Sequence, residues 1–119
     1  MGKEIHTQFG LIDISKLVIA NLAGIATTEC FGIVGMVSSR IFSDGINELL
    51  GKEALGKGVE VTIKDDMLQI KVNVVVGYGT RVSVIATNVI DNVKYIVEKH
   101  TGLQVDQVDV YVQGVRVID

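Results

Sequence analysis

Residues 68–79 read LQIKVNVVVGYG, and this stretch decides the fold. Apolar side chains recur at every second position from Leu68 to Val76, with polar side chains between the first of them. Strict period two is typical of a strand that has one face in a core and the other face toward water. The glycines at 77 and 79 end the strand before a helical pattern begins. We therefore predict a central strand onto which the rest of the chain packs.

The polar side of this strand is a candidate contact face for a partner. It comprises Gln69, Lys71, Asn73 and Val75. Tyr78 marks the turn from the sheet into the next helix, and Arg81 follows it. We predict that these six residues form an interaction surface rather than an active site.

The neighbouring segments supply the rest of a small sheet. Residues 59–64 alternate in the same way, and Asp65-Asp66 makes a tight turn, so residues 59–76 read as a β-hairpin. A last strand is expected over residues 107–113. At Gly114 the apolar positions change parity, which indicates a β-bulge or the end of the sheet.

Helical periodicity predicts helices over residues 16–29, 43–50 and 81–101. Asp13 or Ser15 can cap the first helix, Thr80 is the expected N-cap of the last, and Gly102 suits its left-handed end. The first helix is apolar around most of its circumference, so we expect it to be buried on more than one side, in the domain or against another copy.

Two segments have weaker patterns. Residues 31–39 are expected to form a loop close to the core, and residues 4–12 a short edge strand or an ordered arm. The fold class that results is α+β with two layers: a small, mainly antiparallel sheet covered by the three helices. Residues 1–119 are of a length suited to one domain.

Composition restricts the classes of function. The formal net charge of −3 disfavours a nucleic-acid-binding surface, which needs a basic face. The single cysteine, Cys30, precludes an internal disulfide and fits a reducing, cytoplasmic compartment. Polar residues and glycines interrupt the apolar run over residues 17–39, so no membrane span is expected. The N-terminus lacks the apolar core of a secretory signal.

Three motifs come near to known sites and fall short of them. The glycines at 77 and 79 begin a dinucleotide fingerprint, but Val82 stands where its third glycine is needed. The helix N-terminus beside Arg81 nevertheless suits an anion. Gly32-Ile33-Val34-Gly35 has the glycine spacing of the RNA-clamping loop of KH domains, but its inner residues are apolar.

No catalytic or metal-binding pattern emerges from the sequence. His6, His100 and Cys30 have no second metal ligand at helical or turn spacing. No serine, histidine and carboxylate combine into a nucleophilic triad. We therefore expect a protein that is not an enzyme and needs no cofactor or metal.

Segments along the whole chain resemble the alkaline shock protein family of envelope stress proteins. The most specific are Tyr78-Gly79, Thr101-Gly102-Leu103 and Val110-Tyr111-Val112-Gln113-Gly114-Val115. Residues 12–26, 32–35 and 48–51 are similar to the family's first half in order and spacing. One departure is Cys30-Phe31-Gly32, since many members have proline before the glycine.

The resemblance implies a small cytoplasmic protein without enzyme chemistry. Some members self-assemble or are held at the membrane by an anchor protein, and others accompany a fatty acid kinase-like enzyme. We expect a homo-oligomeric or adaptor protein at the cytoplasmic side of the membrane, with a membrane-anchor protein or a kinase as candidate partner. The alternative is a regulatory module that binds an acyl or phosphorylated metabolite near residues 79–81. RNA binding is the third hypothesis.

Overall fold

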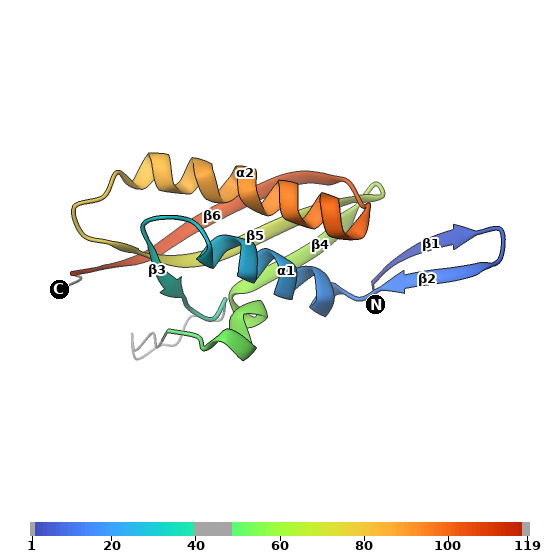
Figure 1. The fold of residues 1–119 in the computed structure, drawn as a ribbon, viewed down its shortest axis with the longest axis horizontal. Helices are drawn as coiled ribbons and strands as arrows, with labels where there is room; N and C mark the ends of the chain where they lie inside the picture. The colour runs from blue at the N-terminus through green and yellow to red at the C-terminus, as the bar shows by residue number, and fades with distance from the viewer. Residues whose placement is uncertain (1, 40–48, 118–119) are drawn as a thin grey trace.

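The computed structural model describes residues 2–39 and 49–117, and it confirms the α+β class. Helices α1 and α2 lie on one face of a four-stranded sheet, while the first two strands form a separate hairpin (Figure 1). The elements in order are β1 Lys3–Thr7, β2 Gly10–Ile14, α1 Lys16–Thr28, β3 Ile33–Met36, the 3-10 helix η1 Lys52–Gly58, β4 Val59–Lys64, β5 Met67–Gly77, α2 Val82–Thr101 and β6 Val105–Arg116.

Strand β5 is the centre of the four-stranded sheet, as the period-two pattern predicts. Its first half pairs with β4 in the predicted antiparallel hairpin, and residues 74–76 pair with β3. Because β6 runs parallel to β5 along residues 68–77, β4 and β3 share the opposite edge of β5 one after the other. Asp65 and Asp66 both have positive φ, which confirms the tight turn.

The core lies between the sheet and the two helices. Alternate side chains of β5, from Leu68 to Val76, are almost completely buried. They form one apolar cluster with four residues of α2 at four-residue spacing, Ile85, Val89, Val93 and Val97, and with small residues of α1. Burial of each valine or leucine side chain contributes roughly 1.5–3 kcal/mol, so the aliphatic core alone accounts for this two-layer packing.

Ser15 is the N-cap of α1, and Asp13, the other candidate, belongs to β2. The Ser15 hydroxyl accepts a hydrogen bond from the Val18 amide at 3.2 Å. The helix packs against α2, where the Asn92 amide donates to the Ala26 carbonyl oxygen at 2.8 Å. Its other side leaves Leu17 and Ile25 exposed, so burial on more than one side does not occur within this chain.

Of the two predicted ends of α2, only the C-terminal one is confirmed. Thr80 is not the N-cap, because its hydroxyl donates to the Gly77 carbonyl oxygen and Arg81 takes the cap position without a side-chain bond. The C-terminal prediction is confirmed, since Gly102 has φ 75° and its amide donates to the Glu98 carbonyl oxygen. Glu98 then accepts from the Val105 amide at 2.9 Å, which fixes the start of β6.

The predicted loop over residues 31–39 is wrong, because residues 33–36 form β3. The glycines of this segment serve packing: Gly32 has φ 90°, and a Cβ there would lie 2.3 Å from Cδ1 of Ile85. A Cβ on Gly35 would lie 3.1 Å from Cδ2 of Leu49. Gly35 therefore belongs to a paired strand, which does not form a phosphate-clamping loop.

Other boundaries differ from the sequence-based ones. The predicted helix 43–50 falls mostly outside the described residues, and residues 49–50 are not helical. The 3-10 helix η1 has no counterpart in the prediction. Strand β6 is longer than the expected 107–113, because the chain passes Gly114 through a register shift, with Val112 opposite Val74 and Gly114 opposite Val75. The predicted bulge is thus confirmed and the strand continues beyond it.

Residues 2–14 form a projecting hairpin, which we call the N-terminal arm. It extends away from the sheet at the N-terminal end of α1 (Figure 1). The radius of gyration is 14.9 Å, above the roughly 13.5 Å expected for a compact chain of this length, and the longest extent is 54 Å. Of the two expectations for this segment, an ordered arm is the one the structure confirms.

We expect Gly32→Ala to destabilise the fold by about 1–3 kcal/mol, because alanine is strained at positive φ and its Cβ would meet Ile85. Urea unfolding followed by circular dichroism measures the change. Gly51→Ala is the matched control, since no atom lies within 4 Å of its added Cβ and its φ is −74°. Equal stability of the two variants would contradict this role of Gly32.

Candidate interaction surfaces

The predicted contact face lies on the side of the sheet away from the helices, which we call the open face. Lys71 is exposed there and Gln69 is half-buried. Asn73 and Val75, however, are only 6% and 4% exposed, so their predicted exposure is wrong. The side chain of Asn73 bonds to Gly58 and Gln113, contacts that the sequence pattern cannot show.

Asn73 is buried because it joins three strands. Its side-chain amide donates to the Gly58 carbonyl oxygen at 3.2 Å, and its Oδ1 accepts from Gln113 Nε2 at 2.8 Å. Its backbone carbonyl oxygen accepts from the Val37 amide at 3.2 Å. The bonds to Gly58 and Val37 lie on the edge of β5 where the last residue of β3, Met36, and the first residue of β4, Val59, meet. Asn73 therefore has a structural role at this junction.

A shallow hollow of about 200 Å³ occupies the open face beside Asn73. Glu60 and Lys71 contribute opposite charges, and Tyr111 contributes a partly exposed ring. Sequence reasoning missed Glu60, Tyr111 and Gln113 as members of this face, although their period-two alternation was the available signal. The hollow offers polar contacts to a protein surface.

A second hollow, the α2 cleft, lies at the N-terminal end of α2. It measures about 370 Å³ and has a mainly apolar lining of Phe31, Val84 and Ile85, with Arg81 at its edge. Tyr78 is 74% exposed in the preceding turn, where its amide donates to the Arg116 carbonyl oxygen. Arg81 and Tyr78 thus lie at the end of β5, separated along the chain from the polar residues of the open face.

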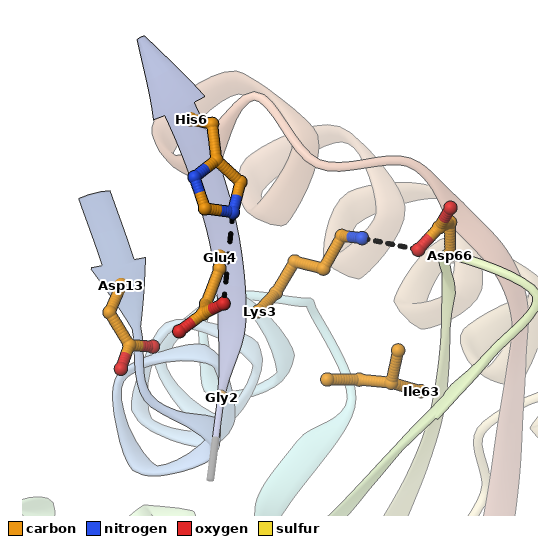
Figure 2. Close-up of a pocket in the computed structure, with 7 residues that line it drawn as sticks. All are labelled: Gly2, Lys3, Glu4, His6, Asp13, Ile63 and Asp66. Atoms are coloured by element: carbon orange, nitrogen blue, oxygen red, sulfur yellow. Dashed lines mark hydrogen bonds and ion pairs between the residues drawn. The ribbon is translucent and has the colours of Figure 1, made fainter. Parts of the chain in front are cut away.

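A groove of about 630 Å³ separates the N-terminal arm from the hairpin β4–β5 (Figure 2). Lys3 extends from β1 to Asp66 in the β4–β5 turn, and its Nζ lies 2.6 Å from Oδ1. The hydrogen bond and charge of Lys3 lower the pKa of Asp66, so the carboxylate keeps its charge at neutral pH and loses it in acid. It is an exposed contact, which stabilises little.

Apolar side chains are exposed along the arm and α1 far more than sequence reasoning indicated. Phe9 at the tip of the arm is 92% exposed and Leu17 on α1 is 67% exposed. We call the set the N-terminal apolar surface: Phe9, Leu11, Ile12, Leu17, Val18, Ile25 and Phe31. Exposed large apolar side chains that are concentrated in one region of a domain are typical of an interaction site. The apolar pattern around the whole of the first helix indicated the part of this surface that lies on α1, but nothing indicated the part on the arm.

The titratable candidates lie apart from one another. His6 is on the arm, where its Nε2 lies 3.8 Å from Glu4 Oε1, and His100 is exposed near the end of α2. Cys30 is half-buried after α1, and burial raises the pKa of its thiol, with a smaller opposing effect of the Asn92 hydrogen bond. Among residues 2–39 and 49–117 no three histidine, cysteine or acidic side chains gather as metal ligands would.

The same described residues contain no helix that is long and apolar enough to cross a membrane. Comparison with known proteins gives the family. Residues 4–117 match the alkaline shock protein 23 family, which has a cell envelope-related function. The chain belongs to this family.

Its relatives cover almost the same length. The uncharacterized protein YloU of Bacillus subtilis is 47% identical, over 98% of both chains. An uncharacterized protein of Streptococcus pyogenes serotype M6 is 40% identical, over 99% of this chain and 98% of its own. The uncharacterized protein YqhY of B. subtilis is 32% identical, over 92% of this chain and 80% of its own. No solved structure matches the chain significantly.

We expect Asn73→Ala to lower the free energy of unfolding by about 1–3 kcal/mol, because the Gly58 carbonyl oxygen loses its buried donor. Chemical denaturation measures this loss. Lys71→Ala, on the same face of the same strand but exposed, should change stability by less than about 0.5 kcal/mol. A neutral Asn73 variant would show that the junction does not depend on the amide.

Proposed function

We propose that this chain is a non-enzymatic, self-associating adaptor that acts at the cytoplasmic side of the cell envelope. The observation that carries the proposal is the N-terminal apolar surface, which is exposed on a chain of the envelope-related family. A folded chain that leaves so many large apolar side chains in water gains free energy by burying them against a partner. The polar open face then remains available for a second protein.

The cell envelope-related function of the family supports an association near the envelope. The described residues carry no metal-ligand cluster, and their histidines lie on separate elements. We expect contact with a membrane-anchor protein to bring the chain to the membrane surface. Binding through protein surfaces also fits the charge pattern, since the open face presents both Lys71 and Glu60 and has no dominant sign.

Sedimentation velocity at micromolar concentration tests the proposal. We expect a dimer or higher oligomer, together with a membrane-associated partner recovered by crosslinking and pull-down from the native cells. Pull-down with a Lys71→Glu, Tyr111→Ala variant tests the open face, because both side chains line its hollow. A strict monomer that recovers no membrane-associated partner would refute the adaptor function.

A second candidate function is a regulatory module that binds an acyl or phosphorylated metabolite and partners a fatty acid kinase-like enzyme. The α2 cleft favours it, because an apolar lining of Phe31, Val84 and Ile85 adjoins the cationic Arg81. An acidic group joined to an alkyl chain matches that combination of surfaces.

Thermal melting with palmitate, and separately with inorganic phosphate, tests this second function. If the cleft binds the probe, the wild-type melting temperature rises and the rise disappears in Arg81→Ala, because the cation is lost. Lys71→Ala is the control, since it removes an exposed cation outside the cleft. A rise that is equal in all three proteins excludes Arg81 as the anion-binding group.

A further inference from the structure

The N-terminal arm has an apolar face without a covering layer. Its cross-strand partners Ile5 and Ile12 share one face with Ile14, which pairs with Lys3. Glu4, Asp13 and His6 lie on the other face with Leu11. An isolated two-stranded hairpin is at best marginally stable in water and requires a further layer to pack against. Ile5 and Ile14 obtain part of this at the base, whereas Ile12 and the tip residue Phe9 do not.

The outer side of α1 also exposes apolar side chains without a covering layer. Leu17, Val18 and Ile25 are exposed, while the inner side of the helix is buried against α2, η1 and β4. A surface helix ordinarily presents polar residues to water. The arm and this side of α1 together hold most of the N-terminal apolar surface, and they are joined by a single residue, Ser15.

The dimensions of the two elements match. Each five-residue strand of the arm is about 17 Å long at 3.4 Å per residue. Helix α1, with 13 residues, is about 20 Å long at 1.5 Å per residue. The arm and α1 extend in opposite directions from their junction (Figure 1). A two-fold axis near that junction therefore lays each arm along the α1 helix of the other copy.

We propose that two copies of this chain form a dimer by exchanging their N-terminal arms, each arm covering the outer side of α1 in the partner. This inference rests on the proposed self-association and names its surface. The tip of the arm, with Phe9, then lies at the C-terminal end of the other α1, where Ile25 and Phe31 are exposed. With a two-fold axis, both copies bury the same apolar surface, as closed symmetry requires.

The area is adequate for a stable dimer. Without Leu11, which lies on the charged face of the arm, the N-terminal apolar surface exposes on the order of 700 Å², close to the roughly 800 Å² that each partner buries in an interface of standard size. The charged face of the arm, with Glu4 and Asp13, remains at the rim. An apolar centre with a polar rim is the usual composition of such interfaces.

A matched pair of substitutions tests the surface. Val18 and Val84 are the third residues of α1 and α2 and are 48% and 49% exposed. Val18→Glu adds a charge to the proposed interface but suits the first turn of a helix capped by Ser15, so the monomer stays folded. We expect it to weaken dimerisation at least about tenfold by sedimentation equilibrium. Val84→Glu should dimerise like the wild type.

A crosslink tests the geometry directly. Cys30 follows the C-terminal end of α1, which ends at Thr28. That end of the helix points away from the arm of the same chain (Figure 1). Under mild oxidation, Gln8→Cys at the tip of the arm should form a disulfide with Cys30 of a second copy and give a covalent dimer. Gln8→Cys combined with Cys30→Ser should give none, because the two arm tips lie apart.

The outcomes separate this inference from the proposed function. Loss of dimer in Val18→Glu, with the Gln8→Cys crosslink, supports arm exchange. A dimer that survives Val18→Glu and does not crosslink overturns arm exchange and leaves self-association standing. A wild-type monomer overturns both. The wild type could also be a monomer that floats with anionic phosphatidylglycerol vesicles, while Val18→Glu does not float. That result shows that lipid covers the surface, and it also overturns arm exchange.

Discussion

The structure depends on the complete pairing of β5 on both edges. β6 accompanies one edge along its whole length, while the other edge is divided between β4 and β3. Two strands that meet end to end leave backbone groups without a ladder partner at the junction, and a buried unpaired group is costly. Asn73 resolves this by bonding to Gly58, and its own carbonyl accepts from Val37. One polar side chain thus allows two short strands to act as one edge.

The sequence predicts those features that depend on local pattern. The hairpin of β4 and β5, the extents of α1 and α2, the left-handed Gly102 and the bulge at Gly114 all follow from periodicity or from one residue's backbone preference. Strand β3 does not, because residues 33–36 become a strand only when β5 presents a free edge far along the chain. Thr80 fails as a cap for a local reason, since its hydroxyl donates to the carbonyl oxygen of Gly77, three residues earlier.

The sequence predicts where the candidate contact face lies, but not which residues form it. Period two places Gln69, Lys71, Asn73 and Val75 on one face, yet it carries no information on what flanks the strand. Asn73 and Val75 prove to be buried, Asn73 through hydrogen bonds to Gly58 and Gln113, and the side chains that complete the face come from β4 and β6. Glycine motifs mislead for a related reason. Gly32 and Gly35 make room for Ile85 and Leu49, and that packing fully accounts for their spacing.

The two helices differ in how many apolar side chains their outer sides expose. α2 carries a polar outer side with scattered apolar residues, as a helix at the surface of a monomer does. α1 carries Leu17, Val18 and Ile25 on the side away from the core, next to an arm whose isoleucine face is also uncovered. The inner side of α1 is already buried against α2, η1 and β4, so within the described residues this outer side has no covering layer. The chain's own core thus accounts for only half of the apolar pattern around α1, and the proposed dimer would account for the other half.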